Sequence, residues 1–68
     1  MISVGDFVSF AGNYVVEKSE KQEIVMSAIS RQGSVIEAGA KFIKVFSENE
    51  VCILPNFSNN ACIIKKIF

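Results

Sequence analysis

Histidine is absent from this chain of 68 residues, and cysteine, proline and net charge are scarce. Without histidine the commonest general base of enzymes is missing, and two cysteines cannot complete a structural zinc site unless carboxylates or a partner add ligands. The sequence contains no Gly-x-x-x-x-Gly-Lys segment and no Gly-x-Gly segment, so a loop that cradles phosphate is not indicated. These absences predict a protein that is not an enzyme, has no small-molecule substrate and holds no metal or other cofactor.

The two cysteines, Cys52 and Cys62, lie in apolar segments. The chain starts without the basic segment and apolar run of a secretory signal, so we expect a cytoplasmic protein, and disulfides are rare in that compartment. We therefore interpret both cysteines as small buried hydrophobic side chains, and a disulfide between them is the less favoured alternative. Apolar surroundings raise the pKa of a thiol, so neither cysteine is a good candidate for a nucleophile.

Charge is balanced, with seven basic and seven acidic residues. The chain therefore lacks the overall positive charge that drives non-specific binding to nucleic acids. The longest uncharged run, residues 51–64, is too short and too polar to cross a bilayer, and no membrane partner is expected. Half of the residues are hydrophobic, which is typical of a folded protein, and the length suits a single domain over residues 1–68.

Apolar and polar residues alternate along much of the chain, as they do in strands that bury one face. The first strand is predicted over residues 3–10, and residues 11–13 are expected to end it in a tight turn. The other four strands are predicted over residues 34–38, 41–47, 51–54 and 61–68. Turns are expected at residues 38–40 and 48–50, and Pro55 ends the fourth strand because it has no amide hydrogen to donate.

Residues 20–32 carry the signals of a helix. Ser19 and Gln22 have the spacing of a capping box, and Gly33 stands where a glycine commonly follows the last turn. Apolar side chains recur at helical spacing at Ile24, Val25, Ala28 and Ile29. The alternative is a strand over residues 23–30, because several of these side chains are β-branched. The capping signals favour the helix, so the predicted fold class is mainly β (α+β), with five strands and one helix inserted between the first two.

Four short segments follow an order seen in small barrels: Gly5-Asp6-Phe7-Val8, Gly33-Ser34-Val35-Ile36, a tight hairpin at Gly39, and Ile53-Leu54-Pro55. In these segments the chain resembles SH3-like small barrels of the KOW or Tudor kind. The resemblance covers residues 3–10 and 33–68, and it departs from the family where the predicted helix replaces a long loop. It implies a five-stranded barrel topology and names no activity.

The strand over residues 41–47 is apolar on both sides. Ile43 and Val45 share one side, while Phe42, Lys44 and Phe46 share the other. The favoured interpretation is that the predicted helix covers these rings and closes a second small core. The alternative is a nucleic-acid-binding face, on which aromatic rings stack against bases. In that case Phe42 would act together with lysines that hold phosphates, namely Lys41, Lys44, Lys65 and Lys66.

Some apolar residues have no evident partner within the chain, and exposed apolar patches usually mark interfaces. These residues, which we predict to bind protein, are Tyr14, Phe57, Ile67 and Phe68. The sequence therefore predicts a non-enzymatic binding module that acts through an apolar surface on a protein partner or on another copy of the chain. Its size would suit a small accessory or virus-encoded regulator, and the alternative is a nucleic-acid-binding barrel.

Overall fold

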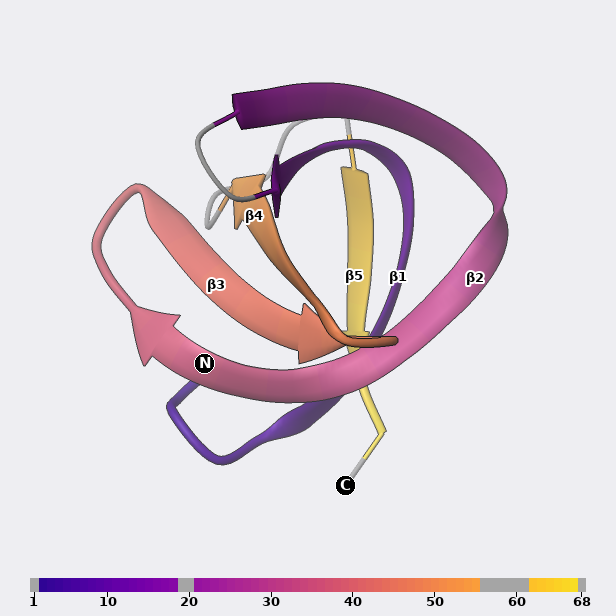
Figure 1. Ribbon diagram of the computed structural model, residues 1–68. Coiled ribbons are helices and arrows are strands. Elements are labelled where there is room, and N and C mark those ends of the chain that lie inside the picture. The colour runs from indigo at the N-terminus through magenta and orange to yellow at the C-terminus, as the bar shows by residue number, and fades with distance from the viewer. Residues whose placement is uncertain (1, 19–20, 56–61, 68) are drawn as a thin grey trace.

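Figure 1 shows the computed structural model, which describes residues 2–18, 21–55 and 62–67. Five strands run in chain order, and the described residues contain no helix. The strands are β1 (Phe7–Lys18), β2 (Lys21–Ala38), β3 (Phe42–Ser47), β4 (Glu50–Pro55) and β5 (Cys62–Lys66). The mainly β part of the prediction therefore holds and its α+β part does not. The predicted second strand falls within β2, and the predicted third, fourth and fifth strands overlap β3, β4 and β5.

The strands form a closed ring of four with a fifth strand added. All pairs are antiparallel: β1 pairs with β2, β2 with β3, β3 with β4, and β4 again with β1, while β5 pairs with β1. A closed ring satisfies the backbone groups that an open sheet would leave at its edges. This arrangement is compatible with a small SH3-like barrel.

The ring closes because β1 bends, so that its two halves pair with different strands. Its first half, Val8–Gly12, pairs with β5, and its second half, Val15–Glu17, pairs with β4. Gly12, with a φ of +116°, lies at the bend, where the register against β2 also shifts. The prediction that residues 11–13 end the first strand is therefore wrong: the glycine bends the strand, which continues to Lys18.

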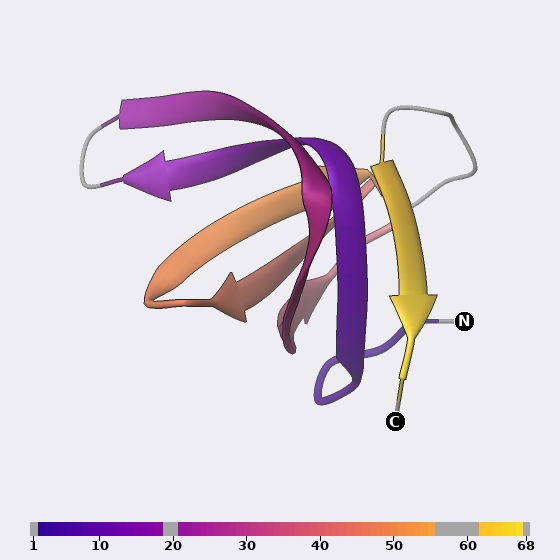
Figure 2. The same ribbon diagram turned by 90° about the vertical axis from the view of Figure 1, so that its right-hand side faces the viewer.

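The helix predicted over residues 20–32 is not present, because Lys21–Ala38 forms the single long strand β2. Pairs such as Val15 with Ile24 show that β1 occupies the hydrogen-bonding edge of this segment. A helix of this length gains little stability alone, and long-range pairing of β-branched residues outweighs its local signals. The capping residue Ser19 lies outside the described residues. Figure 2 shows the second half of β1 and the first half of β2 projecting together to the side opposite β5.

The core fills the inside of the ring. Its buried members are Val8, Phe10, Tyr14, Val16, Val35, Ile43, Val45, Cys52, Leu54 and Cys62. Gly33 lies where β2 crosses close to β3, and a Cβ atom there would stand 2.7 Å from Val45 Cγ1 and 2.9 Å from the Cβ of Ser47. The glycine predicted to end a helix therefore permits the close approach of two strands.

Two predicted turns are confirmed. Glu48 and Asn49 have φ values of +52° and +63° and join β3 to β4, with Ser47 paired to Glu50. Both central residues at positive φ give the two-residue hairpin whose twist matches that of the flanking strands. Between β2 and β3, the Gly39 amide donates a hydrogen bond of 2.8 Å to the carbonyl oxygen of Phe42.

Candidate functional site

The outward side of four neighbouring strands carries a continuous set of apolar side chains. Residues paired across antiparallel strands point to the same side of the sheet, so cross-strand pairs define rows. One row joins Ile24 on β2, Val15 on β1, Ile53 on β4 and Lys44 on β3. Two further rows flank it. The first contains the pairs Met26 with Asn13 and Phe42 with Pro55. The second joins Gln22, Glu17, Val51 and Phe46. The apolar members, Val15, Ile24, Met26, Phe42, Phe46, Val51, Ile53 and Pro55, are called the outer apolar face below.

Four of the eight members of the outer apolar face are exposed to solvent, and the other four are half-buried. Ile24 and Met26 are 82% and 80% exposed, and Phe42 and Phe46 are 57% and 46% exposed. The helix expected to cover these rings does not exist, and residues 21–30 lie beside them as part of the same sheet. Most single exposed apolar residues need no explanation, but a contiguous set of this size usually marks a binding surface.

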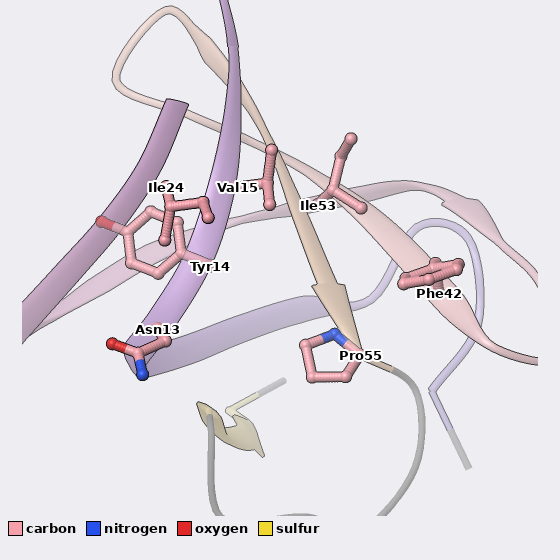
Figure 3. Close-up of a pocket in the computed structure, with 7 residues that line it drawn as sticks. All are labelled: Asn13, Tyr14, Val15, Ile24, Phe42, Ile53 and Pro55. Atoms are coloured by element: carbon pink, nitrogen blue, oxygen red, sulfur yellow. The ribbon is translucent and has the colours of Figure 1, made fainter. Parts of the chain in front are cut away.

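A shallow pocket lies within this face. It has a volume of about 170 Å³ and is lined by Asn13, Tyr14, Val15, Ile24, Phe42, Ile53 and Pro55. Figure 3 shows Ile24 and Phe42 on opposite sides of this space, with Val15 and Ile53 along one edge and Pro55 along another. The strands β1, β2, β3 and β4 all contribute to the lining, so the pocket depends on the closed ring.

Charged side chains lie among and beside the apolar members of the face and form ion pairs within the chain. Lys44 Nζ lies 3.5 Å from Glu17 Oε2 and 4.0 Å from Glu37 Oε2. Lys18 Nζ lies 3.6 Å from an oxygen of Glu23 and 3.6 Å from one of Glu50. Such exposed pairs add little stability. Together these ion pairs contain two lysines and four glutamates, so they carry a net charge of minus two.

The side chain of Arg31 on β2 contacts residues of β1, β3 and β4. Arg31 Nη1 donates a hydrogen bond of 3.2 Å to the Tyr14 hydroxyl, and Nη2 donates one of 2.8 Å to the Ser47 carbonyl oxygen. Its guanidinium also forms ion pairs with Glu48 at 3.0 Å and Glu50 at 3.2 Å. Burial alone would lower the pKa of Arg31, but the hydrogen bond to Tyr14 and the nearby Glu48 outweigh it, so the pKa is raised and the charge is kept.

The residues predicted to bind protein occupy different parts of the structure. Tyr14 is a core residue, only 3% exposed, whose ring packs edge-on against Phe10 with centroids 5.1 Å apart. Ile67 follows β5 and is 39% exposed, and its amide donates a hydrogen bond to the Phe7 carbonyl oxygen. Phe57 and Phe68 lie outside the described residues.

The residues of the predicted nucleic-acid face are not brought together. Phe42 and Lys44 are on β3, and Lys41 directly precedes that strand. Lys65 and Lys66 are on β5, which the strand order separates from β3 by β4 and β1. Lys44 is paired with two glutamates, as described above, and Lys66 Nζ lies 3.6 Å from Asp6 Oδ2.

The chemistry of the described residues is sparse. Cys52 and Cys62 are buried free thiols, as predicted, and burial raises the pKa of both. Within residues 2–18, 21–55 and 62–67, no cluster of acidic and cysteine side chains could hold a metal ion. In the same residues no helix is long and apolar enough to span a membrane.

No protein-family model, curated protein or solved structure matches this chain. The sequence interpretation included Phe42 in a candidate surface but missed the contribution of Ile24 and Met26, because Ile24 was placed on the buried side of a helix. The sequence did contain a signal for them. Gln22, Ile24 and Met26 occupy every second position, so in a strand the two apolar residues lie on the same side. The importance of Arg31, the single arginine of the chain, also became visible only in the structure.

Proposed function

We propose that this chain is a non-enzymatic protein-binding module, a small barrel of the SH3-like kind, that binds its partner on the outer apolar face. The observation that carries the proposal is a pocket built by four strands and lined by the exposed Ile24 and Phe42, with the exposed Met26 and Phe46 on the same side of the sheet. Methionine and aromatic residues are enriched in the interfaces of proteins, and charged residues are depleted from their centres.

The pocket gives this face a place for an anchoring side chain. Its volume of about 170 Å³ is close to that of an engineered apolar cavity of roughly 150 Å³ that binds benzene. A phenyl ring or a branched aliphatic side chain of the partner therefore fits between Ile24 and Phe42. Interfaces usually draw most of their affinity from a few such buried anchors.

Protein is better supported than nucleic acid as the partner. A nucleic-acid face needs several lysines placed to neutralise phosphates beside the stacking rings. Here Lys44 is already paired with Glu17 and Glu37, and Lys65 and Lys66 stand on β5, away from Phe42. The buried free thiols of Cys52 and Cys62 suit a reducing compartment, so a small cytoplasmic accessory regulator is the role that we propose.

The test compares three immobilised proteins in affinity capture from cells: the wild type, the face variant I24D and the matched control I63D. Ile24 and Ile63 are both exposed, at 82% and 64%, but Ile63 is on β5 outside the face. A specific partner should be captured by the wild type and by I63D and lost with I24D. With that purified partner, calorimetric affinity should change little between low and high salt, because the contact is apolar. Equal capture by I24D, or an affinity that falls steeply with salt, would refute the proposal.

A further inference from the structure

We propose that the outer apolar face binds a second copy of this chain in a two-fold symmetric dimer, with Met26 of each protomer in the pocket of the other. This inference rests on the proposed function, because it names the occupant of the same face. Two features of the face point to its own copy: the exposed area and the placement of a protruding side chain beside a pocket.

The exposed area is sufficient for a small stable dimer. Large apolar and aromatic side chains each present about 150 to 250 Å² when fully exposed. Scaled by the exposed fractions of Ile24, Met26, Phe42 and Phe46, and with a smaller share from the half-buried members, the face presents on the order of 600 Å² per protomer. A pair would bury about 1,200 Å², at the lower end of stable protein interfaces. A monomer seldom leaves a larger apolar patch than this uncovered.

The face carries a protrusion and a pocket side by side. Met26 is 80% exposed and is paired across the strands with Asn13, which lines the pocket. In a two-fold interface, if residue i of one protomer contacts residue j of the other, then j also contacts i. A surface that holds both the protruding side chain and the pocket can therefore form the same contact twice in a two-fold dimer. The flexible thioether of methionine suits such a pocket, and sulfur packs favourably against the edge of a ring such as that of Phe42.

The ion pairs at the face reduce the repulsion between two identical faces but do not abolish it. A face of one dominant charge would repel its own copy, since a two-fold axis places like surfaces together. Here Lys44 lies between Glu17 and Glu37, and Lys18 lies between Glu23 and Glu50, so four glutamates stand against two lysines and these ion pairs sum to minus two. The whole chain has a net charge of zero, so no long-range repulsion opposes association.

Sedimentation equilibrium of the full chain from low micromolar to millimolar concentration tests the dimer. The mass should rise from 7.5 kDa towards twice that value. I24D and M26D should each raise the dimer dissociation constant at least about tenfold, the change expected when an anchoring contact is lost. I63D should behave as the wild type. Ile24, Met26 and Ile63 are exposed, and circular dichroism verifies that each variant is folded. A mass of 7.5 kDa at every concentration, or equal weakening by I63D, would overturn the inference.

Disulfide trapping tests the seating of Met26. M26C and F42C proteins, one of them tagged, are oxidised separately and as an equal mixture. The mixture should form the mixed disulfide in clear excess over either symmetric one, because Met26 faces the partner's pocket beside Phe42. Cys52 and Cys62 are buried and their pKa values are raised, so they should add little background. No excess of the mixed disulfide would overturn this arrangement.

The outcomes separate the dimer from the proposed function. If the wild type is monomeric but I24D still loses the capture of another protein, the face binds that protein and does not bind a second copy of the chain. If I24D changes neither the mass nor the capture, both are wrong.

Discussion

Replacing Arg31 with methionine is expected to remove most of the stability of the barrel. Arg31 is 13% exposed at its side chain and joins β2 to Tyr14 on β1 and to Ser47 at the end of β3. Methionine keeps a flexible apolar stem of similar reach but removes every donor. The Ser47 carbonyl oxygen and the Tyr14 hydroxyl would then lose a charged partner.

The magnitude follows from these contacts. A hydrogen bond from a charged donor contributes about 1.5 to 3 kcal/mol, and Arg31 donates two to neutral acceptors. The pair with Glu48 adds at most about 1 kcal/mol, because the Glu48 side chain is 73% exposed and water replaces the lost partner. The loss is therefore roughly 3 to 7 kcal/mol. A domain of this size has a total stability of only about 3 to 10 kcal/mol.

Urea unfolding of the wild type and R31M, followed by far-ultraviolet circular dichroism and by the fluorescence of Tyr14, measures this loss. The matched control is K21M, which replaces an exposed cation on the same strand and should change the free energy of unfolding by no more than about 0.5 kcal/mol. If R31M unfolds within about 1 kcal/mol of the wild type, the arginine does not hold the strands together and the reasoning fails.

Three further predictions concern the closure of the ring, the exposed rings and the thiols. G33A should destabilise the protein by at least about 1 to 3 kcal/mol, since a Cβ there would press on β3 and Val45; unchanged urea unfolding would show that β2 and β3 do not approach so closely. At concentrations at which the chain is a monomer, F42A should lower the free energy of unfolding by less than about 1 kcal/mol, because the ring is 57% exposed; a loss of several kcal/mol there would mean that other parts of the same chain cover the ring. Burial raises the pKa of Cys52 and Cys62 above the ordinary 9.0, so these thiols keep their protons to a higher pH in the folded state than in the unfolded state. Their contribution to the free energy of unfolding should therefore be fully present below pH about 9 and should fall as pH rises above it. Thermal unfolding at a series of pH values checks this, and the double variant C52A/C62A should show a smaller fall; an identical fall would assign it to other groups.

Much of the barrel could be predicted because its signals are local. Period-two alternation located the third and fifth strands, and the polar turn at residues 48–50 together with Pro55 bounded the fourth. The burial of Cys52 and Cys62 followed from their apolar neighbours. These features depend on residues that are adjacent in the sequence, so a single sequence is enough to reveal them.

The prediction failed where distant pairing decides the structure. Residues 21–32 have helical capping and spacing signals, yet β1 pairs with them and draws them into a long strand. That change moves Ile24 from a predicted core to the outside of the sheet, where it is 82% exposed. The candidate site was therefore only partly visible in the sequence: Phe42 was identified, but its neighbours on the outer apolar face depend on the register between strands.

The most direct test of the binding face is a methyl nuclear magnetic resonance spectrum of the wild type recorded over a dilution series. The chemical shifts of Val15, Ile24 and Ile53 should move together with concentration, while those of Ile63 on β5 and the buried Ile43 stay fixed. Shifts that move mainly at Ile63, or that move nowhere up to millimolar concentration, would contradict self-association through this face.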